Sequence, residues 1–248
     1  MSKDSNFDRY RRRFLGGAAT TIAGMSLAPG ILLQSIGHAK PADEAVSSDV
    51  RWGMLIDSNK CASGCNDCVQ ACNDEHGLTG FGRPKTDSQW IRKATLKDKQ
   101  TGYTQTLPLL CQHCEKPPCV DVCPTGASFQ RKDGIVLVDK HICIGCRYCM
   151  MACPYKARSF VHEDLHDQKP WSPRGKGTVE SCTFCVHRVD NDRTPACVEA
   201  CTAENHNAMV FGDMNDPDSE LSRQLGKYHS RQIRADLELN TGVRYRGI

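Results

Sequence analysis

The sequence lacks the short motifs that hold the common organic cofactors. None of its C-x-x-C pairs is followed by histidine, which excludes covalently attached c-type haem. There is no G-x-G-x-x-G run and no phosphate-binding loop, which argues against a nucleotide cofactor bound in the usual ways. No acid–base constellation can be identified either. An active site built on these cofactors or on acid–base catalysis is therefore not expected.

Aromatic residues and excess charge are also scarce. Aromatics make up 6% of the 248 residues and hydrophobic residues 39%, so an apolar core alone is insufficient, and inorganic crosslinks are expected to add stability. The formal charge is +3, and residues 1–39 contribute five cations and two anions, so the rest of the chain is neutral by this count. This balance predicts no binding to nucleic acid.

Only one stretch is free of charge for long enough to cross a membrane, and it lies at the N-terminus. Residues 14–37 are interrupted by glycine and proline and follow Arg11-Arg12-Arg13-Phe14-Leu15, which fits a bacterial twin-arginine signal. Gly37-His38-Ala39 is a small-x-small cleavage site, so we expect residues 1–39 to be a signal peptide. The alternative is an uncleaved membrane anchor. The signal predicts export to the periplasm.

Cysteine, by contrast, is abundant. All 16 cysteines fall into four runs of four, with none left over as a spare nucleophile. The runs are Cys61-x3-Cys65-x2-Cys68-x3-Cys72, Cys111-x2-Cys114-x4-Cys119-x3-Cys123, Cys143-x2-Cys146-x2-Cys149-x3-Cys153 and Cys182-x2-Cys185-x11-Cys197-x3-Cys201. The third run, followed by proline, has the spacing of bacterial ferredoxins, in which three thiolates hold one [4Fe-4S] cluster and the fourth reaches a neighbouring cluster. Four such runs predict four [4Fe-4S] clusters.

Two other uses of the cysteines stay open at this point. Structural zinc sites are usually two C-x2-C pairs separated by a longer spacer, which is not the pattern of these runs. An exported protein commonly uses cysteines in disulfides, because its compartment is oxidising. The twin-arginine route, however, carries proteins that have already folded, so clusters can be inserted in the reducing cytoplasm. Neither zinc nor disulfides explain the fourfold repetition.

The endings of the runs indicate which runs share clusters. The two central runs both end in Cys-Pro and the two outer runs do not, so like is expected to pair with like. The predicted ligand sets are Cys111, Cys114, Cys119 with Cys153; Cys143, Cys146, Cys149 with Cys123; Cys61, Cys65, Cys68 with Cys201; and Cys182, Cys185, Cys197 with Cys72. Sequential pairing, first run with second and third with fourth, is the alternative.

Short elements are expected between the runs. Period-two patterns and turn signals predict strands at residues 52–56, 90–96, 103–107, 127–131 and 135–139, the last four forming two hairpins, and an extended segment at 158–163. Residues 135–138 are expected to cover the clusters. A helix at 69–76 ends at Gly77, and Gly64 can tighten the longer first loop of its run.

Two expectations concern the second half of the chain. Residues 186–196, between Cys185 and Cys197, are polar and contain Pro195, so they are expected to form a loop rather than a regular element. A C-terminal helix is expected at residues 217–225, with Asp216 as its cap, Pro217 in its first position and Gly226 beyond its end. The rest of the tail carries no clear signal.

Four charged or polar side chains lie beside the cysteines. Lys60 and Arg147 are candidates for raising a cluster's potential by stabilising its reduced form. His113 and His187 are candidate hydrogen-bond donors to a cluster. The commoner role of such residues is an exposed charge or a surface histidine of a loop, which is the expectation for the two histidines.

The runs and their flanks resemble the four-cluster electron-transfer subunits of bacterial respiratory complexes. The resemblance rests on the order of the runs, on Cys-Gln-His-Cys-Glu-Lys-Pro-Pro-Cys at Cys111 and on Cys-Ile-Gly-Cys-Arg-Tyr-Cys-Met-Met-Ala-Cys-Pro-Tyr at Cys143. That group includes the B subunits of polysulfide and dimethyl sulfoxide reductases. Segments after Cys153, around Cys182 and at residues 211–219 are similar to the DsrO subgroup, the periplasmic subunits of Dsr membrane complexes in sulfur metabolism. The extra residue between Cys61 and Cys65 departs from the family pattern.

The pairing and the resemblance together imply an architecture and partners. The expected fold is α+β, with two ferredoxin-like 2[4Fe-4S] units, short hairpins and a C-terminal helix. The inner unit, residues 111–177, is expected to be inserted in an outer unit made of residues 40–110 and 178–248. The resemblance implies an NrfD-type quinone-reactive membrane partner and a multihaem cytochrome c.

Three functions are compatible with these features. The leading hypothesis is a periplasmic relay that passes single electrons between the quinone-reactive subunit and a redox partner in sulfur metabolism. Alternatives are the B subunit of a molybdenum-containing reductase or hydrogenase, and an enzyme that reduces a sulfur compound directly at an exposed cluster. Because fully ligated clusters have no open iron site, the sequence favours relay over catalysis.

Overall fold

The computed structural model of the chain describes residues 46–62, 64–166 and 168–248. The predicted signal peptide and its cleavage site lie outside these residues. Within the described ranges, no helix is long and apolar enough to cross a membrane. All sixteen cysteines lie in the described ranges, and none forms a disulfide. The disulfide alternative therefore has no support in the structure.

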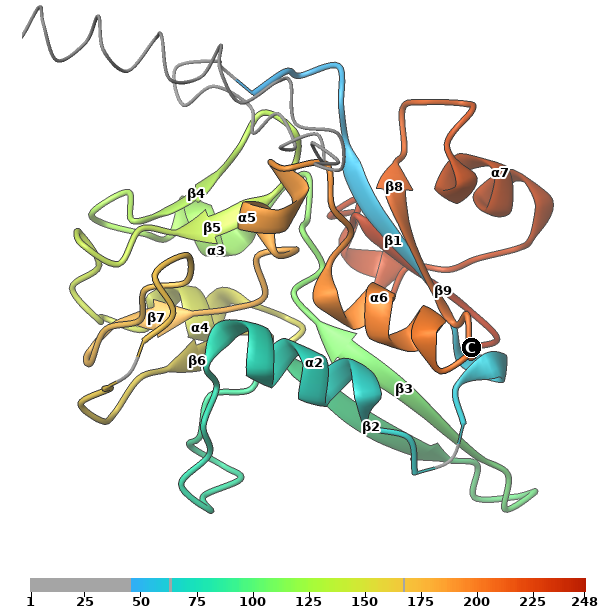
Figure 1. The fold of residues 1–248 in the computed structure, drawn as a ribbon, viewed down its shortest axis with the longest axis horizontal. Helices are drawn as coiled ribbons and strands as arrows, with labels where there is room; N and C mark the ends of the chain where they lie inside the picture. Colours follow the sequence, from blue (N-terminus) through green and yellow to red (C-terminus); the bar gives the residue numbers. More distant parts are fainter. Residues whose placement is uncertain (1–45, 63, 167) are drawn as a thin grey trace, which may run out of the picture. The chain divides into compact units, whose positions relative to one another are not determined.

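A three-stranded sheet joins the beginning and the end of the described chain (Figure 1). Its central strand β1 (Trp52–Asp57) pairs antiparallel with β8 (Met209–Asp213) and parallel with β9 (Val243–Arg246). All of β1 after Trp52 is buried, as expected for a central strand covered on both faces. The strand predicted at residues 52–56 is confirmed. Strand β9 follows the predicted C-terminal helix, in a part of the chain for which no element was predicted.

Three two-stranded sheets are formed by the part of the sequence between β1 and β8. They are β2 (Ile91–Lys97) with β3 (Thr104–Leu110), β4 (Ser128–Gln130) with β5 (Val136–Val138), and β6 (Ser159–Phe160) with β7 (Val179–Glu180), all antiparallel. The first two are the predicted hairpins. In the second, Gly134 has a φ of +87°, the left-handed conformation that its Asp-Gly turn requires.

The helices are short and several carry cysteines. They are α2 (Asp67–His76), α3 (Pro118–Asp121), α4 (Tyr148–Ala152), α5 (Val186–Val189), α6 (Ala196–Ala203) and α7 (Glu220–Lys227), with 3-10 turns η2 (Ser58–Lys60) and η3 (Ala235–Leu237). As predicted, α2 ends at Gly77, which is left-handed and donates its N–H to Asn73 O. Figure 1 shows α2 and α6 packed side by side.

The predicted loop at residues 186–196 is confirmed for residues 190–195, which form no helix or strand, and is wrong at its two ends. The segment begins with one helical turn, α5, and its end is the start of α6, with Pro195 as the N-cap residue. Proline is tolerated at a helix start because no backbone N–H is needed there. Pro195 therefore marks where α6 begins, rather than an irregular loop.

The predicted limits of the C-terminal helix are also wrong. Helix α7 begins at Glu220, and Ser219 caps it by accepting a hydrogen bond from Ser222 N. The Asp216 carboxylate instead accepts from Asp218 N in a turn before the helix. Gly226 lies inside the last turn of α7. The two candidate caps lie three residues apart, and the second one prevails.

Cysteines form much of the buried core. The larger core cluster packs seven cysteines around Trp90, Phe184 and Tyr245. Each of these three aromatic residues is at most 1% exposed. A smaller cluster packs Cys119 and Cys149 with Val136 and Val179. The thiols thus share the interior with the apolar side chains.

Candidate metal centres

One backbone feature recurs at the start of all four cysteine runs. The residue directly before the second cysteine has a positive φ: +80° at Gly64, +44° at His113, +68° at Gly145 and +53° at Phe184. This conformation turns the chain back so that the two flanking thiols face the same side. It costs a non-glycine residue about 1–2 kcal/mol, so packing must hold His113 and Phe184 in place. Their rings stack on each other, with centroids 3.7 Å apart.

The inner runs form two hollows that are each lined by four cysteines. Cys111, Cys114, Cys119 and Cys153 line one of them, together with Tyr155 and Arg158. The other is lined by Cys123, Cys143, Cys146 and Cys149. Each hollow therefore receives three cysteines from one run and the last cysteine of the other. Packing of α3 on α4 brings Cys119 and Cys149, from different hollows, into one core cluster.

The outer runs meet through helices α2 and α6. Cys68 and Cys72 lie on α2, and Cys197 and Cys201 lie on α6. Burial raises the pKa of Cys68 to about 12, and the neighbouring thiols of Cys61, Cys65 and Cys201 act in the same direction against Lys93. Burial likewise raises the pKa of Cys72 well above its usual value, and the thiols of Cys197, Cys185 and Cys68 act in the same direction. Cys182 adjoins Cys72, Cys197 and Cys185.

These thiols fit metal-bound thiolates better than free thiols. Burial raises the pKa of Cys111 and of Cys114 to about 12, and in each case the neighbouring thiols add to the rise. A coordinating metal deprotonates a thiol outright and so removes this cost. Four thiols around one hollow are the donor set of a four-iron cluster.

Arg158 gives an independent test of fit. Its side chain is buried, yet its Nε and Nη1 atoms have no hydrogen-bond partner among the described residues. The same holds for the buried hydroxyl of Tyr155, which lines the same hollow. A buried guanidinium requires nearby negative charge. A cluster with four thiolates carries net negative charge, so the residues present fit the group.

Some thiols already accept hydrogen bonds from the protein. Ser128 N donates to Cys123 Sγ and Ala208 N donates to Cys201 Sγ, each over 3.3 Å. At Cys123, burial opposes ionisation, but the Ser128 and Thr125 donors outweigh it and lower the pKa of the thiol. Hydrogen bonds to cluster sulfurs are one way in which proteins set the reduction potential.

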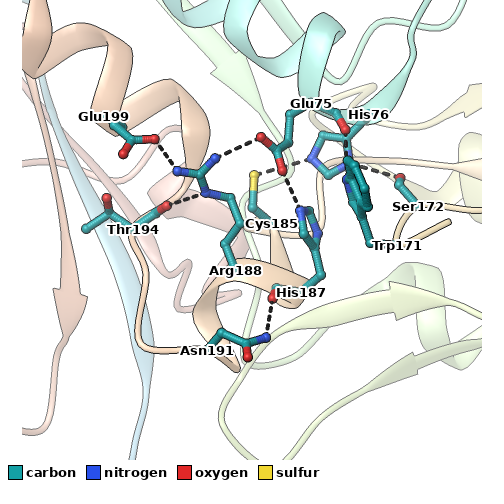
Figure 2. Close-up of polar contacts among 10 residues, drawn as sticks. All are labelled: Glu75, His76, Trp171, Ser172, Cys185, His187, Arg188, Asn191, Thr194 and Glu199. Atoms are coloured by element: carbon teal, nitrogen blue, oxygen red, sulfur yellow. Dashed lines mark hydrogen bonds and ion pairs between the residues drawn. The ribbon is translucent and has the colours of Figure 1, made fainter. Parts of the chain in front are cut away.

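His76 contacts a cysteine of the last run (Figure 2). Its Nε2 lies 3.3 Å from Cys185 Sγ, and its Nδ1 lies 2.9 Å from Ser172 Oγ. Burial, and then the charge of His187, lowers the pKa of His76 to about 3, so the ring is neutral. With Ser172 donating to Nδ1, the Nε2–H is free to donate to the sulfur, which is the tautomer that satisfies both bonds with a thiolate.

A charged network lies beside His76 (Figure 2). Glu75 accepts from His187 Nε2 over 2.7 Å and from Arg188 Nη1 over 2.8 Å, and Arg188 also pairs with Glu199. Burial opposes ionisation of Glu75, but these two donors outweigh it and lower its pKa. The network ties the end of α2 to α5 and α6.

The four side chains that the sequence placed beside the cysteines, Lys60, His113, Arg147 and His187, differ in burial and in their contacts. The expectation of a surface histidine is wrong for His113, which is 1% exposed and accepts from Val136 N at its Nδ1, because its left-handed backbone turns the ring inward onto Phe184. His187 is half-buried and bonds Glu75 rather than a thiol. Lys60 and Arg147 are exposed, and Arg147 lies over the Phe160 ring.

Sequence reasoning missed the residues that do contact the cysteines. His76 lies four residues after Cys72, Lys93 bonds the Cys65 carbonyl, and Arg158 lies five residues after Cys153. His76 and Lys93 reach their partners through long-range packing, so no local pattern marks them. For Arg158, the Cys-Pro-Tyr-Lys-Ala-Arg segment indicated a family resemblance but no contact.

Comparison with known proteins agrees with the metal chemistry. Two family models, both described as 4Fe-4S dicluster domains, match residues 60–127 and 102–214. Together they span all sixteen cysteines. Two dicluster domains and sixteen cysteines in four groups correspond to four [4Fe-4S] clusters, as the sequence predicted.

Curated relatives cover nearly the whole chain. It is 42% identical to the Hdr-like menaquinol oxidoreductase iron-sulfur subunit 1 of Archaeoglobus fulgidus, over 95% of this chain and 97% of that protein. It is 38% identical to the B subunit of the Salmonella typhimurium tetrathionate reductase, over 90% of this chain and 81% of that protein. It is 41% identical to the B subunit of the Allochromatium vinosum sulfite dehydrogenase, over 71% and 75%. The chain belongs to the family of ferredoxin-type 4Fe-4S dicluster subunits that transfer electrons in respiratory oxidoreductases, in the group of the dimethyl sulfoxide and tetrathionate reductase B subunits.

Proposed function

We propose that the sixteen cysteines hold the four clusters in crossed sets, in which each run lends its last cysteine to its partner run. The two inner hollows support this for the inner runs, since each is lined by three cysteines of one run and one of the other. For the outer runs, the support is the packing of α2, which carries Cys68 and Cys72, on α6, which carries Cys197 and Cys201. The thiols of Cys61, Cys65 and Cys201 raise the pKa of Cys68, and those of Cys72, Cys185 and Cys197 raise the pKa of Cys182. The sets are those predicted from the sequence.

The same crossing implies that an inner unit, residues 111–177, is inserted in an outer unit of residues 40–110 and 178–248. Pairing of β1 with β8 and β9, and packing of α2 on α6, tie the two outer segments together. The stacked rings of His113 and Phe184 join the units between Cys114 and Cys185. This supports the order Cys61 set, Cys182 set, Cys111 set and Cys143 set along the electron path.

We propose that the protein is a periplasmic relay of the DsrO type. Bound clusters supply one-electron chemistry, and the chain places them, sets their potentials and keeps water away. Cys146 is the one exposed cysteine of the sixteen, and Cys143 beside it is half-buried. The observation that supports a partner here is the exposed apolar face around Cys146, made of Ile142, Ile144, Tyr148 and Met151, which are 48–73% exposed.

We assign this apolar face to the quinone-reactive membrane subunit rather than to the cytochrome. Permanent subunit interfaces are more apolar than transient ones, and large exposed apolar patches mark interaction sites. A cytochrome that exchanges electrons in brief encounters needs a more polar contact. The other end of the path, at the Cys61 set, remains for the second partner.

A paired substitution on this face tests the relay. Ile144→Glu with Met151→Glu is expected to slow reduction of the clusters by quinol-containing membranes about tenfold, a loss of about 1.4 kcal/mol in binding. Reduction by a small soluble dye should be unchanged. The matched control is Leu96→Glu, which alters a similarly exposed residue (52%) on the β2–β3 hairpin.

Two outcomes would count against this assignment. Turnover of sulfite, polysulfide or tetrathionate by the purified, chemically reduced protein alone would show direct catalysis instead of relay. Copurification from membranes with a molybdenum-containing subunit would favour the alternative, the B subunit of a reductase. Two of the relatives are named as B subunits of reductases.

The hydrogen bond from His76 predicts a change in one outer cluster. His76→Leu removes the donor to Cys185 Sγ, so the potential of the Cys182-set cluster is expected to fall by about 59 mV, a tenfold change in its reduction equilibrium. EPR-monitored redox titration measures it. His187→Gln is the control, because His187 bonds Glu75 and no thiol. Equal shifts in both variants would contradict a role for the sulfur hydrogen bond.

A further inference from the structure

Arg158 lines the hollow of the Cys111 set, and its hydrogen-bond partner Ser128 lines the hollow of the Cys143 set. It directly precedes β6 and its side chain is 6% exposed. Its Nη2 donates to Cys119 Sγ over 3.1 Å and to Ser128 Oγ over 2.7 Å. Cys149, on α4, packs with Cys119 in the smaller core cluster, and the charge of Arg158 opposes the rise that burial causes in the pKa of Cys149. One guanidinium therefore bonds a cysteine of one inner set and lies near a cysteine of the other.

The charge of Arg158 is not balanced by a carboxylate. Three other buried or half-buried arginines of the described chain have acidic partners: Arg131 pairs with Asp133, Arg174 with Glu180, and Arg188 with Glu75. Within the same described ranges, Arg158 has sulfur and hydroxyl partners only, and its Nε and Nη1 are unpartnered. The negative charge that a buried guanidinium needs must come from the clusters.

A cation shared by two neighbouring clusters has two effects. It stabilises the reduced form of each, because reduction adds negative charge, and so raises both potentials. It also offsets the repulsion between the two clusters when both are reduced. The second effect makes the second electron easier to accept. A relay that must pass electrons through both clusters gains on both counts.

We propose that Arg158 is the shared counter-cation of the two inner clusters, and that it raises and couples their reduction potentials. The proposal rests on the crossed ligand sets proposed above. It concerns a positioning residue, because Arg158 acts on the clusters through Cys119 and Cys149. Its predicted signature is a paired change in two clusters, with the outer two unaffected.

The test compares Arg158→Gln and Arg158→Lys with the unaltered protein by EPR-monitored redox titration. In Arg158→Gln, both inner clusters are expected to be at least tenfold harder to reduce, about 59 mV each, with a wider separation between the two steps. Arg158→Lys retains the charge at a single point that cannot serve both thiols, so smaller shifts are expected. Arg223→Gln is the control, since Arg223 is an exposed arginine on α7 that pairs with Glu220 and lines neither inner hollow.

The outcomes separate this proposal from the one it rests on. Unchanged potentials in Arg158→Gln with full iron content would overturn it, as would equal shifts in all four clusters. Should Arg158→Gln fail to retain iron, the Arg158→Lys variant decides: unshifted inner potentials in that variant, at full iron content, would leave only a structural role. Fewer than four clusters in the unaltered protein would instead refute the ligand assignment.

Discussion

Removing Cys65 and Cys201 together is expected to cost this protein no more iron than removing either one alone. Both belong to one proposed ligand set, although their positions in the sequence differ by 136 (201 − 65 = 136). Each single change to alanine is expected to lower iron from about 16 to about 12 atoms per chain, because one four-iron cluster is lost. In the double variant the same cluster is lost, so the iron stays at about 12.

The control pair is Cys65→Ala with Cys72→Ala. These cysteines belong to the same run and to helix α2 or its approach, but to different proposed sets. The double variant is expected to fall to about 8 iron atoms, since two clusters are lost. Effects that share one site are not additive, whereas effects on separate sites are. Iron analysis with low-temperature EPR counts the clusters.

The two pairs distinguish every simple ligand scheme. If each run held its own cluster, the same-run pair would lose one cluster and the Cys65–Cys201 pair two, which is the reverse of the expected result. If the runs paired sequentially, Cys65 and Cys201 would again belong to different clusters. Loss of about 8 iron atoms in the Cys65–Cys201 pair would therefore contradict the crossed sets.

Local patterns were enough to predict the features that depend on neighbouring residues. The Asp133-Gly134 turn, the end of α2 at Gly77 and the spacing of each cysteine run all follow from the backbone preferences of a few adjacent residues. The hollows follow from that spacing once two runs face each other. For this reason the metal chemistry was evident before the fold.

Features that depend on distant residues were not predictable. Strand β9 has a short, charged sequence, Val-Arg-Tyr-Arg, and exists because β1 offers a free edge for parallel pairing. The start of α7 depended on which of two nearby caps prevailed. His76 and Arg158 meet their sulfurs only when segments from opposite ends of a unit are packed together. No local signal marks such a contact in one sequence.

Removing the iron from the folded protein is expected to unfold it. The larger core cluster contains Cys68, Cys72, Cys111, Cys153, Cys182, Cys197 and Cys201. Without metal, Cys111 and Cys153 would face the hollow that they line with Cys114 and Cys119, and Arg158 would be a buried cation with no anion among the described residues. Each of these changes is costly to a folded chain.

The magnitudes favour complete unfolding over local loosening. Binding of a structural metal contributes about 10–16 kcal/mol in small zinc domains, whereas a whole domain is stable by only about 5–15 kcal/mol. Four clusters in a chain with few aromatic residues therefore contribute more than the apolar core can replace. Anaerobic treatment with a chelator and an oxidant should abolish the near-ultraviolet circular dichroism and the cooperative melting transition.

The control for unfolding is the same chelator without the oxidant, which is expected to leave the clusters and the melting transition intact. Readdition of iron and sulfide under reducing conditions should restore both together, because binding and folding are one process in such a protein. An iron-free chain that still melted cooperatively would show that β1, β8 and β9 with their packed helices suffice as a core. In that case the clusters would bind to a chain that folds without them, and apolar packing rather than the metal would keep the cysteines buried.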